Sequence, residues 1–393
     1  MICVKSLQLD LNRALLLMVG LWPYKQSKFA RVQLIVFYII LISSIIFQFT
    51  TFITAECNSQ MVIEILSNAF FFITLAIKYN MFNFNMDTVK YLLEVLQYTY
   101  NELRDDGEIA IIKKYGTIAK RYTYALTILS VFGIFSVMLL PFWPRFLDNV
   151  FSMNESRSHV SLYIVTEYFV NQEKYFYLIL LHVNSAFCIG WIALLAVGTM
   201  TIACWQYACG MFQIASYRME QAMMDDALKI NDTYNIGLKR IICGIDMHRK
   251  ALAFVKYFLS KIEVSYFFLM TGVVITLSLN LYRVFDGLSS GVDIEKLISP
   301  AVFLATNYVL MFLSNYTAQQ VKDHNDLLFI TAYNIQWYVT PLYIQRIILF
   351  LLQKGIKSFN MNLVGLMVGS LEGFSTLASA SISYFAVIYS VRQ

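Results

Sequence analysis

The residues with the clearest chemical pattern lie in the last apolar segment of the chain. Ser379, Ser383, Val387 and Val391 recur every four residues, so a helix would place them in one stripe. The first half of this stripe is small and hydroxylated, and the second half is branched and apolar. Such a stripe serves either as the wall of a water-filled pore or as a surface for close helix packing. The spacing alone leaves both interpretations open.

The residues that usually perform catalysis or bind metal ions show no such pattern. The four histidines are His159, His182, His248 and His324, and none is placed as an acid–base group or a metal ligand. The six cysteines include no closely spaced pair of the CxxC type. The sequence therefore predicts no enzyme, no catalytic residues, no metal ion and no cofactor.

The composition indicates a membrane protein. Of the 393 residues, 58% are hydrophobic and only 14% are charged, whereas a soluble domain carries about 25% charged residues. So little polar surface excludes a soluble enzyme, a nucleic-acid-binding protein and a disordered scaffold. The apolar runs are long rather than alternating, which predicts an all-α protein that crosses the lipid bilayer several times.

Seven apolar segments are long enough to form transmembrane helices, each of which needs about 20 residues. They are Val32–Ile53, Val62–Tyr79, Tyr122–Phe142, Phe176–Tyr207, Val264–Tyr282, Leu297–Tyr316 and Leu363–Val391. The fourth is expected to continue beyond the membrane toward Gln221. Basic residues bracket a shorter apolar patch, so Tyr333–Lys357 is predicted to be an amphipathic cytosolic helix that begins after Pro341 or breaks there.

The distribution of basic residues predicts the orientation. With the N-terminus inside, 24 of the 30 lysine and arginine residues fall on the cytosolic side and six fall outside. The N-terminus is therefore expected in the cytosol and the C-terminus outside the cell. The sequon at Asn154 falls in the outer loop between the third and fourth spans, where it is expected to be glycosylated.

Two other classes of membrane protein remain as alternatives. A seven-helix receptor that signals through G protein has the opposite orientation, and this chain lacks the Asp-Arg-Tyr and Asn-Pro-x-x-Tyr motifs of that class. A small-molecule transporter often contains a repeated half and charges near the membrane midplane. The chain has no doubled pattern, and Glu64 and Lys78 are expected at the two ends of the second span, with their charges at the interfaces.

Three stretches together resemble the insect odorant receptor family. Near the N-terminus lies Val19-Gly20-Leu21-Trp22-Pro23, followed by Ser27. After the sixth span come Ala318–Leu328, Ala332-Tyr333 and Trp337-Tyr338. Near the end of the chain lie Ser370-Leu371-Glu372-Gly373-Phe374 and Ser383-Tyr384-Phe385, in the region by which the family is most easily recognised. The chain lacks the long cytosolic insertion of the shared co-receptor, so it resembles an odour-tuning subunit.

This resemblance implies an odorant-gated, non-selective cation channel, assembled as a tetramer around a central pore in the plasma membrane of olfactory sensory neurons. The implied partners are an odorant co-receptor subunit in a heterotetramer, a small volatile ligand and the permeating cations. Residues 1–316 would then hold the first six transmembrane helices. Residues 317–361 would form a cytosolic anchor region, and residues 362–393 the pore-lining seventh helix.

The resemblance also assigns roles within the last helix. Aligned through the Ser383-Tyr384-Phe385 motif, Val387 and Val391 fall on the family's hydrophobic gate, and Ser390 falls beside it. Four copies of an apolar side chain close a pore because water is unfavourable inside the ring. Ser383 lies one turn before this gate and belongs to the same pore stripe. Glu372 lies near the start of the helix, either in a cation-attracting vestibule or in an ion pair with a basic residue.

The ligand site is expected in the outer half of the helical bundle. A volatile ligand offers mainly apolar area, so its pocket should be lined by aromatic and methionine side chains with few polar groups. The candidates are Phe71 and Phe72 in the second span, Phe135, Met138 and Leu139 in the third, His182 and Ser185 in the fourth, and Phe303, Thr306 and Asn307 in the sixth.

Overall fold

A computed structural model describes residues 7–24, 27–54, 58–139, 141, 164–172, 174–224, 233–291, 294–356 and 359–392. The described chain is helical except for one small β-hairpin and the connecting segments. Seven of its helices are long and apolar enough to cross a membrane, and each contains one of the seven apolar segments or most of it. The predicted all-α membrane fold is therefore confirmed.

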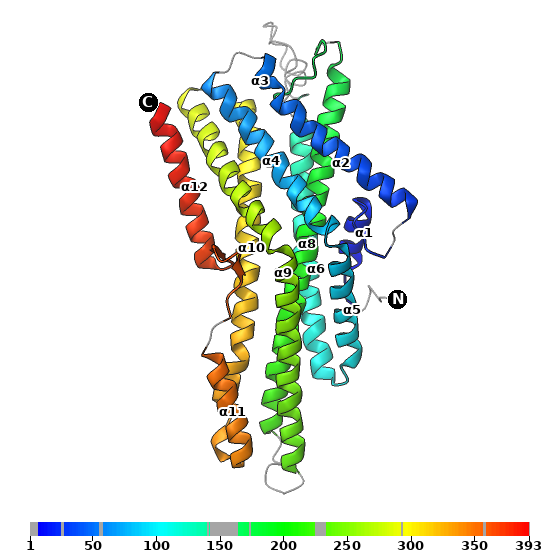
Figure 1. Cartoon of the computed structure of the whole chain (residues 1–393), viewed down its shortest axis with the longest axis vertical. Coiled ribbons are helices and arrows are strands. Elements are labelled where there is room, and N and C mark those ends of the chain that lie inside the picture. The colour runs from blue at the N-terminus through cyan, green and yellow to red at the C-terminus, as the bar shows by residue number, and fades with distance from the viewer. Residues whose placement is uncertain are drawn as a thin grey trace.

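The helices and strands follow one another along an elongated molecule (Figure 1). Their bounds are α1 Asp10–Met18, α2 Lys28–Phe49, α3 Thr51–Thr54, α4 Ser59–Asn83, α5 Met86–Glu102, α6 Asp106–Leu139, α8 Phe176–Met224, α9 Thr233–Ser289, α10 Ile294–Asn334, the 3-10 helix η3 Trp337–Val339, α11 Leu342–Gly355, β1 Asn362–Leu363, β2 Met367–Val368 and α12 Leu371–Arg392. The first apolar segment lies in α2 and runs on into the short α3.

Three long helices, α8, α9 and α10, run through most of the length of the molecule and pack against one another (Figure 1). The 49 residues of α8 span about 74 Å at 1.5 Å per residue, whereas the hydrocarbon core of a bilayer is about 30 Å thick. More than half of this helix therefore lies outside the hydrocarbon. The predicted continuation of the fourth span toward Gln221 is confirmed, because α8 ends at Met224.

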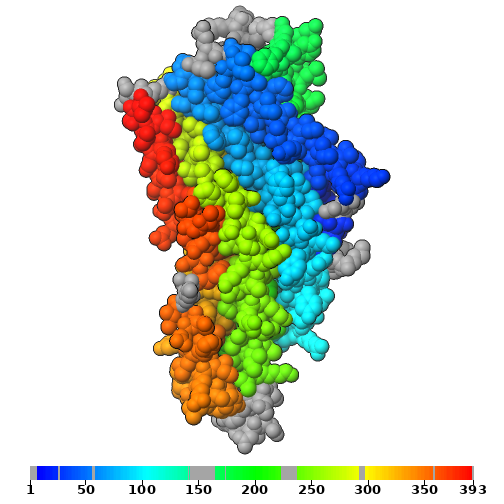
Figure 2. Space-filling view, in the orientation of Figure 1, coloured from blue at the N-terminus to red at the C-terminus, as the bar shows by residue number. Residues whose placement is uncertain are grey.

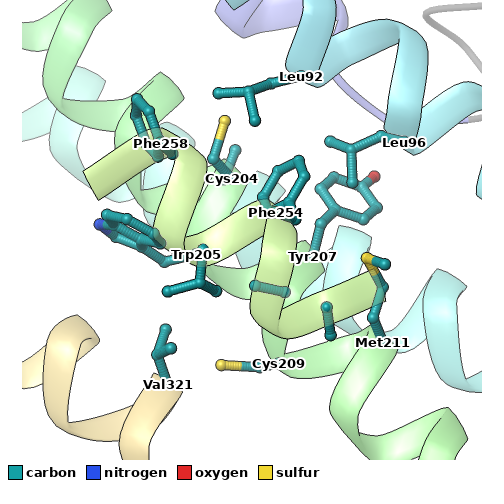
Figure 3. Packing of buried hydrophobic residues seen from close by; sticks show 14 of the residues in the cluster. Leu92, Leu96, Cys204, Trp205, Tyr207, Cys209, Met211, Phe254, Phe258 and Val321 are labelled. Atoms are coloured by element: carbon teal, nitrogen blue, oxygen red, sulfur yellow. The ribbon is translucent and has the colours of Figure 1, made fainter. Parts of the chain in front are cut away.

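The core of the lower half holds these helices together. Figure 3 shows Tyr207 of α8 beside Phe254 of α9 and Leu96 of α5, all of them buried. The Tyr207 hydroxyl donates a hydrogen bond to the carbonyl of Leu7, which precedes α1. This bond fixes the segment before the first span to α8, one of the three long helices of the bundle. A buried phenol normally finds such a partner, since an unpaired hydroxyl is costly in an apolar core.

The last apolar segment differs from its expected form. Its first residues form β1 and β2, an antiparallel hairpin in which Leu363 pairs with Met367, and the helix α12 begins only at Leu371. The turn places Gly365 at φ +71°, a left-handed conformation that glycine adopts without strain and that a continuous helix excludes. The expectation of one continuous span from Leu363 was therefore wrong at its start.

Two local devices begin α12. The backbone N–H of Gly373 donates to the Ser370 hydroxyl at 3.0 Å, which is a helix N-cap contact. A side chain at Gly373 would collide with the carbonyl of Val368 in β2. Gly373 therefore allows the hairpin and the helix to approach each other closely, which gives the Ser370–Phe374 motif a structural reason.

The predicted break near Pro341 is confirmed. The helix α10 ends at Asn334, η3 follows, and α11 begins at Leu342, directly after the proline. Proline lacks an N–H and restricts the residue before it, so it suits this position at a helix start. The helix α11 then packs against the lower end of α10 (Figure 1).

Candidate functional site

A cavity of about 390 Å³ lies between α6, α8 and α10. The helices α4 and α9 each add one residue to its wall, Lys78 and Tyr266. The main walls include Phe132, Gly133 and Ser136 from α6, Trp191, Leu194, Gly198 and Trp205 from α8, and Thr306, Leu310 and Thr317 from α10. Its size falls in the range of sites for small organic molecules, about 300–1,000 Å³.

Small residues leave this space between large aromatic ones. A Cβ added to Gly133 would lie 3.1 Å from Cζ2 of Trp191, so the glycine allows the indole ring to approach α6. A Cβ added to Gly198 would meet nothing within 4 Å, because that position opens directly into the cavity. The sequence thus builds the cavity by omitting side chains at defined positions.

The hydroxyl groups of the wall hydrogen-bond to their own helices. Thr306 donates to the carbonyl of Val302 at 2.7 Å, and Thr201 donates to the carbonyl of Val197 at 2.8 Å. Thr317 bonds in the same way within α10. With these protons used, the threonines present mainly methyl groups and the wall is largely apolar. Such a wall suits a ligand that binds through buried apolar area.

Lys78 is the charged exception in this wall. Its side chain is only 4% exposed, and its Nζ lies 5.9 Å from the ring centroid of Tyr266. None of the ion pairs formed between described residues involves Lys78. The expectation that this lysine extends its charge to the membrane interface was therefore wrong: helix packing directs the side chain inward, toward α9 and α10. Glu64, in contrast, pairs with Arg283 at 2.7 Å.

The predicted ligand residues fall into groups with different surroundings. Thr306 lines the cavity, and Phe71 and Asn307 line a separate small space of about 10 Å³ that shares Lys78 with it. Phe71, Phe72 and Phe303 are buried in one aromatic cluster together with Trp191. The rings of Phe71 and Phe303 are stacked with centroids 4.1 Å apart. Because Trp191 belongs to both the cluster and the cavity, this cluster backs one wall of the cavity.

His182 and Ser185 lie nearer the start of α8, outside the cavity lining. The ring nitrogens of His182 lie 2.9 Å from the Ser43 hydroxyl and 2.7 Å from the Tyr168 hydroxyl. The Ser185 hydroxyl donates to the carbonyl of Leu181 at 2.7 Å. The cavity begins at Trp191, which lies six residues or about 9 Å further along the helix than Ser185.

The three candidates in α6 also lie outside the cavity lining. Phe135 and Leu139 are 61% and 57% exposed and point away from the bundle. The Met138 sulfur lies 3.7 Å from the Cys188 thiol of α8. The face of α6 that meets the cavity contains Phe132 and Ser136 instead, one helical turn apart. Asn154, the predicted glycosylation site, lies outside the described residues.

The predicted pore residues share one face of α12. Ser383, Val387, Ser390 and Val391 are all exposed, and Val391 is 83% exposed. The opposite face packs against α9 and α10, where the Ser278 hydroxyl donates to the carbonyl of Ser381 at 3.0 Å. Figure 2 shows α12 as a ridge at the margin of the molecule. Within the chain, the stripe is therefore not a helix-packing surface.

Most of the residues that line the cavity were not predicted from the sequence, although two sequence features point to them. One is the lone lysine within an apolar span, since a charge inside the membrane is energetically costly and commonly marks a functional site. The other is the run of small residues Ser130, Gly133 and Ser136 at three-residue spacing along one side of α6, in a chain rich in aromatic residues. No group of three or more His, Cys, Asp and Glu side chains in the described chain could hold a metal ion.

Comparison with known proteins identifies the family. The sequence pattern of the 7tm Odorant receptor family matches residues 58–382. Two solved structures of the insect olfactory receptor OR5 from Machilis hrabei have the same fold. The complex with eugenol gives a TM-score of 0.79 at 16% identity and covers 99% of this chain and 97% of that one. The second OR5 structure gives a TM-score of 0.78 at 15% identity, with the same coverage.

Among curated protein sequences there is no match. The family match nevertheless extends over most of the chain and includes five of the seven long apolar helices completely and the first half of α12. It agrees with the resemblance found in the sequence and with a receptor rather than an enzyme. The chain is a multi-pass membrane protein that belongs to the 7tm odorant receptor family.

Proposed function

We propose that this chain is the odour-tuning subunit of a ligand-gated, non-selective cation channel, and that the cavity between α6, α8 and α10 binds its volatile ligand. The observation that carries the proposal is a largely apolar cavity of about 390 Å³ within an odorant receptor fold. Each methylene group buried there contributes about 0.8 kcal/mol to binding. The complex of the similar OR5 protein with eugenol supports a small organic ligand.

The proposed pore is lined by α12 in a tetramer with the odorant co-receptor. Support comes from the exposed stripe that ends in Val387 and Val391, because a transmembrane helix with such a free face is available for a shared central channel. Four apolar side chains at one level would exclude water and ions in the closed state. Residues 317–361, which include the end of α10 and all of α11, form the proposed cytosolic anchor between subunits.

The proposed location is the plasma membrane of olfactory sensory neurons, with the N-terminus in the cytosol. Epitope tags test this orientation in cells that express the chain with a co-receptor subunit. A tag after Gln393 should stain intact cells, and a tag before Met1 should stain only permeabilised cells. The reverse pattern would contradict both the orientation and the proposed pore.

Current recordings test the function directly. Cells that express both subunits are exposed to a panel of volatile compounds, with and without block of G proteins. The proposal expects cation currents that survive the block and require both subunits. Currents that disappear with the block would favour a G-protein-coupled receptor, and accumulation of the compound without current would favour a transporter.

A cavity-filling variant tests the binding site. Gly198→Phe places a ring where the glycine opens into the cavity, so the ligand concentration for half-maximal current should rise more than about tenfold. Leu181→Phe is the matched control, since Leu181 lies on the same helix, is 63% exposed and does not line the cavity. An unchanged response of the Gly198→Phe channel would move the ligand site elsewhere.

A further inference from the structure

Lys78 is the one charged side chain among the described residues that line the cavity. Its neighbours in the wall include Tyr266 of α9 and Ser314 of α10, and Leu310 lies one turn before Ser314. Phe132, Trp191 and Val302 also line the cavity. The wall along α10 runs from Val302 to Thr317, about 23 Å at 1.5 Å per residue. Leu310 and Ser314, in the second half of that stretch, also border the small neighbouring space together with Lys78.

The ammonium group of Lys78 has no anionic partner in this wall. None of the described residues that line the cavity is an aspartate or a glutamate. The Nζ of Lys78 lies 5.9 Å from the ring centroid of Tyr266. Such a cation–π contact replaces only part of the hydration that a buried charge loses. Several hydroxyl groups of the wall already donate to carbonyls of their own helices. A ligand that brings a negative oxygen would therefore complete the site.

We propose that the ligand is a small carboxylic acid whose carboxylate accepts a hydrogen bond from Nζ of Lys78. Its hydrocarbon chain would lie against Trp191 and Phe132, and the cavity volume of about 390 Å³ suits a molecule of this size. This inference rests on the proposed function of the cavity as the ligand site. It adds a specificity-determining residue, because a charge-assisted hydrogen bond contributes more than a bond to a neutral donor.

Matched ligands provide the first part of the test. Cells with both subunits receive octanoic acid, 1-octanol or methyl octanoate, which share a chain length and differ in their head groups. The expected order of potency has octanoic acid first. Equal or higher potency of the alcohol and the ester would overturn the proposal, because their head groups carry no negative charge.

Matched variants provide the second part. Lys78→Met leaves an unbranched side chain that is one atom shorter and removes the charge, so the half-maximal concentration of octanoic acid should rise about 10- to 100-fold. That of 1-octanol should change less than about threefold. Lys78→Arg should retain a preference for the acid. Lys90→Met is the control, since Lys90 also lies 5.9 Å from a tyrosine ring, that of Tyr24, but is exposed and outside the cavity.

A binding measurement separates failure of this inference from failure of the proposed channel. The purified full chain in detergent should melt at a higher temperature with octanoic acid than without it, and the Lys78→Met chain should lose that increase. This result without any current would support the acid site and contradict the channel. Currents evoked by all three compounds, unchanged in the Lys78→Met subunit at equal surface expression, would support the channel and overturn the acid site.

Discussion

The helices α8 and α12 are both apolar enough to cross a membrane, yet the chain surrounds one and leaves the other at its edge. In the most apolar stretch of α8, 72% of the residues are buried within the chain, whereas in α12 the share is 6%. Their mean hydropathies are 2.1 and 1.4, so both are well suited to lipid. Hydropathy therefore predicts which helices enter the membrane, and packing determines which of them become the core.

Small residues have opposite uses in the two helices. Ala196, Ala203 and Ala208 of α8 are fully buried, and they allow neighbouring helices to approach closely. Ser379 and Ser383 of α12 are similarly small but exposed. The same sequence feature thus marks a packing surface in one helix and a free face in the other. A face left free by its own chain is available to another subunit, to lipid or to water.

Truncation of a core aromatic residue should have the largest effect on stability. Phe212→Ala removes a fully buried ring from α8 and should cost about 3–5 kcal/mol of the free energy of unfolding. Tyr384→Ala is the counterpart in α12, where the ring is 60% exposed, and should change stability by less than about 0.5 kcal/mol. Melting of the purified variants in detergent measures the difference. Similar losses for both would show that α12 is held as firmly as α8.

The ion pair between α6 and α8 should have the next largest effect. Arg218 donates two hydrogen bonds to Glu108, at 2.6 and 2.9 Å, and the carboxylate is 9% exposed. Glu108→Gln leaves the guanidinium without its counter-charge, so the cost should be about 2–3 kcal/mol. A double-mutant cycle with Arg218→Met isolates the interaction. A coupling energy near zero would show that solvent replaces the pair.

Substitutions in the proposed gate should change the current through the channel without changing the stability of the fold. Val387→Ser lets the proposed apolar ring hold water, so the channel should conduct several-fold more current without odorant and keep its order of ligand preference. Val391→Ser should act in the same direction. Stability should change by less than about 0.5 kcal/mol, since Val387 is 58% exposed.

An exposed apolar residue on a different face of α12 provides the control for the gate. Ile382 is 59% exposed, and Ile382→Ser should leave the basal current unchanged. Altered odorant preference with normal basal current in the Val387→Ser channel would place Val387 in a binding or packing role. Equal leak in both variants would show that general loosening of α12, and not a water-filled ring, opens the channel.

The smallest expected effect belongs to an exposed ion pair in the lower bundle. A hydrogen bond from Tyr98 and the nearby Lys250 ammonium lower the pKa of Glu102 below its usual value of 4.5. Its contribution is therefore present above pH 4.5 and is lost as the pH falls through the lowered pKa. Because both side chains are more than one-third exposed, the contribution should stay below about 0.5 kcal/mol.

Melting temperatures at two pH values test the contribution of Glu102. The Glu102→Gln chain should melt slightly below the unmodified chain at neutral pH, and this difference should disappear well below pH 4.5. A difference that persists at low pH would assign the effect to packing and not to the charge. A loss as large as that of Glu108→Gln would show that exposure does not weaken this pair.

The sequence predicted the spans well because each depends on local composition. The apolar run Phe176–Tyr207 and the proline at 341 each determine a local outcome, and both expectations were confirmed. The predicted start of the last span was wrong for the same reason. Val364, Gly365 and Leu366 are apolar enough for a span, but they form the turn of a β-hairpin. Hydropathy does not register backbone conformation.

The cavity was harder to predict because it depends on the rotation of each helix. Phe132 and Phe135 lie in the same apolar run, and only their angular positions on α6 decide which one meets the cavity. Lys78 shows the same problem. Its position near the end of a span predicts a charge at the membrane interface, whereas the face of α4 on which it lies buries its side chain between helices. Helix rotation follows from contacts between distant segments, which no local pattern contains.

The unbroken length of α10 after Pro300 has a mechanical consequence. Its residues from Val302 to Thr317 line the cavity, and the same helix continues without interruption to Asn334. From the residue after Pro300, this rod is about 50 Å long. A tilt of one degree about its upper end would therefore move its lower end by about 1 Å. A displacement at the ligand too small to alter side-chain packing would be magnified into a shift the size of an atomic radius at the far end.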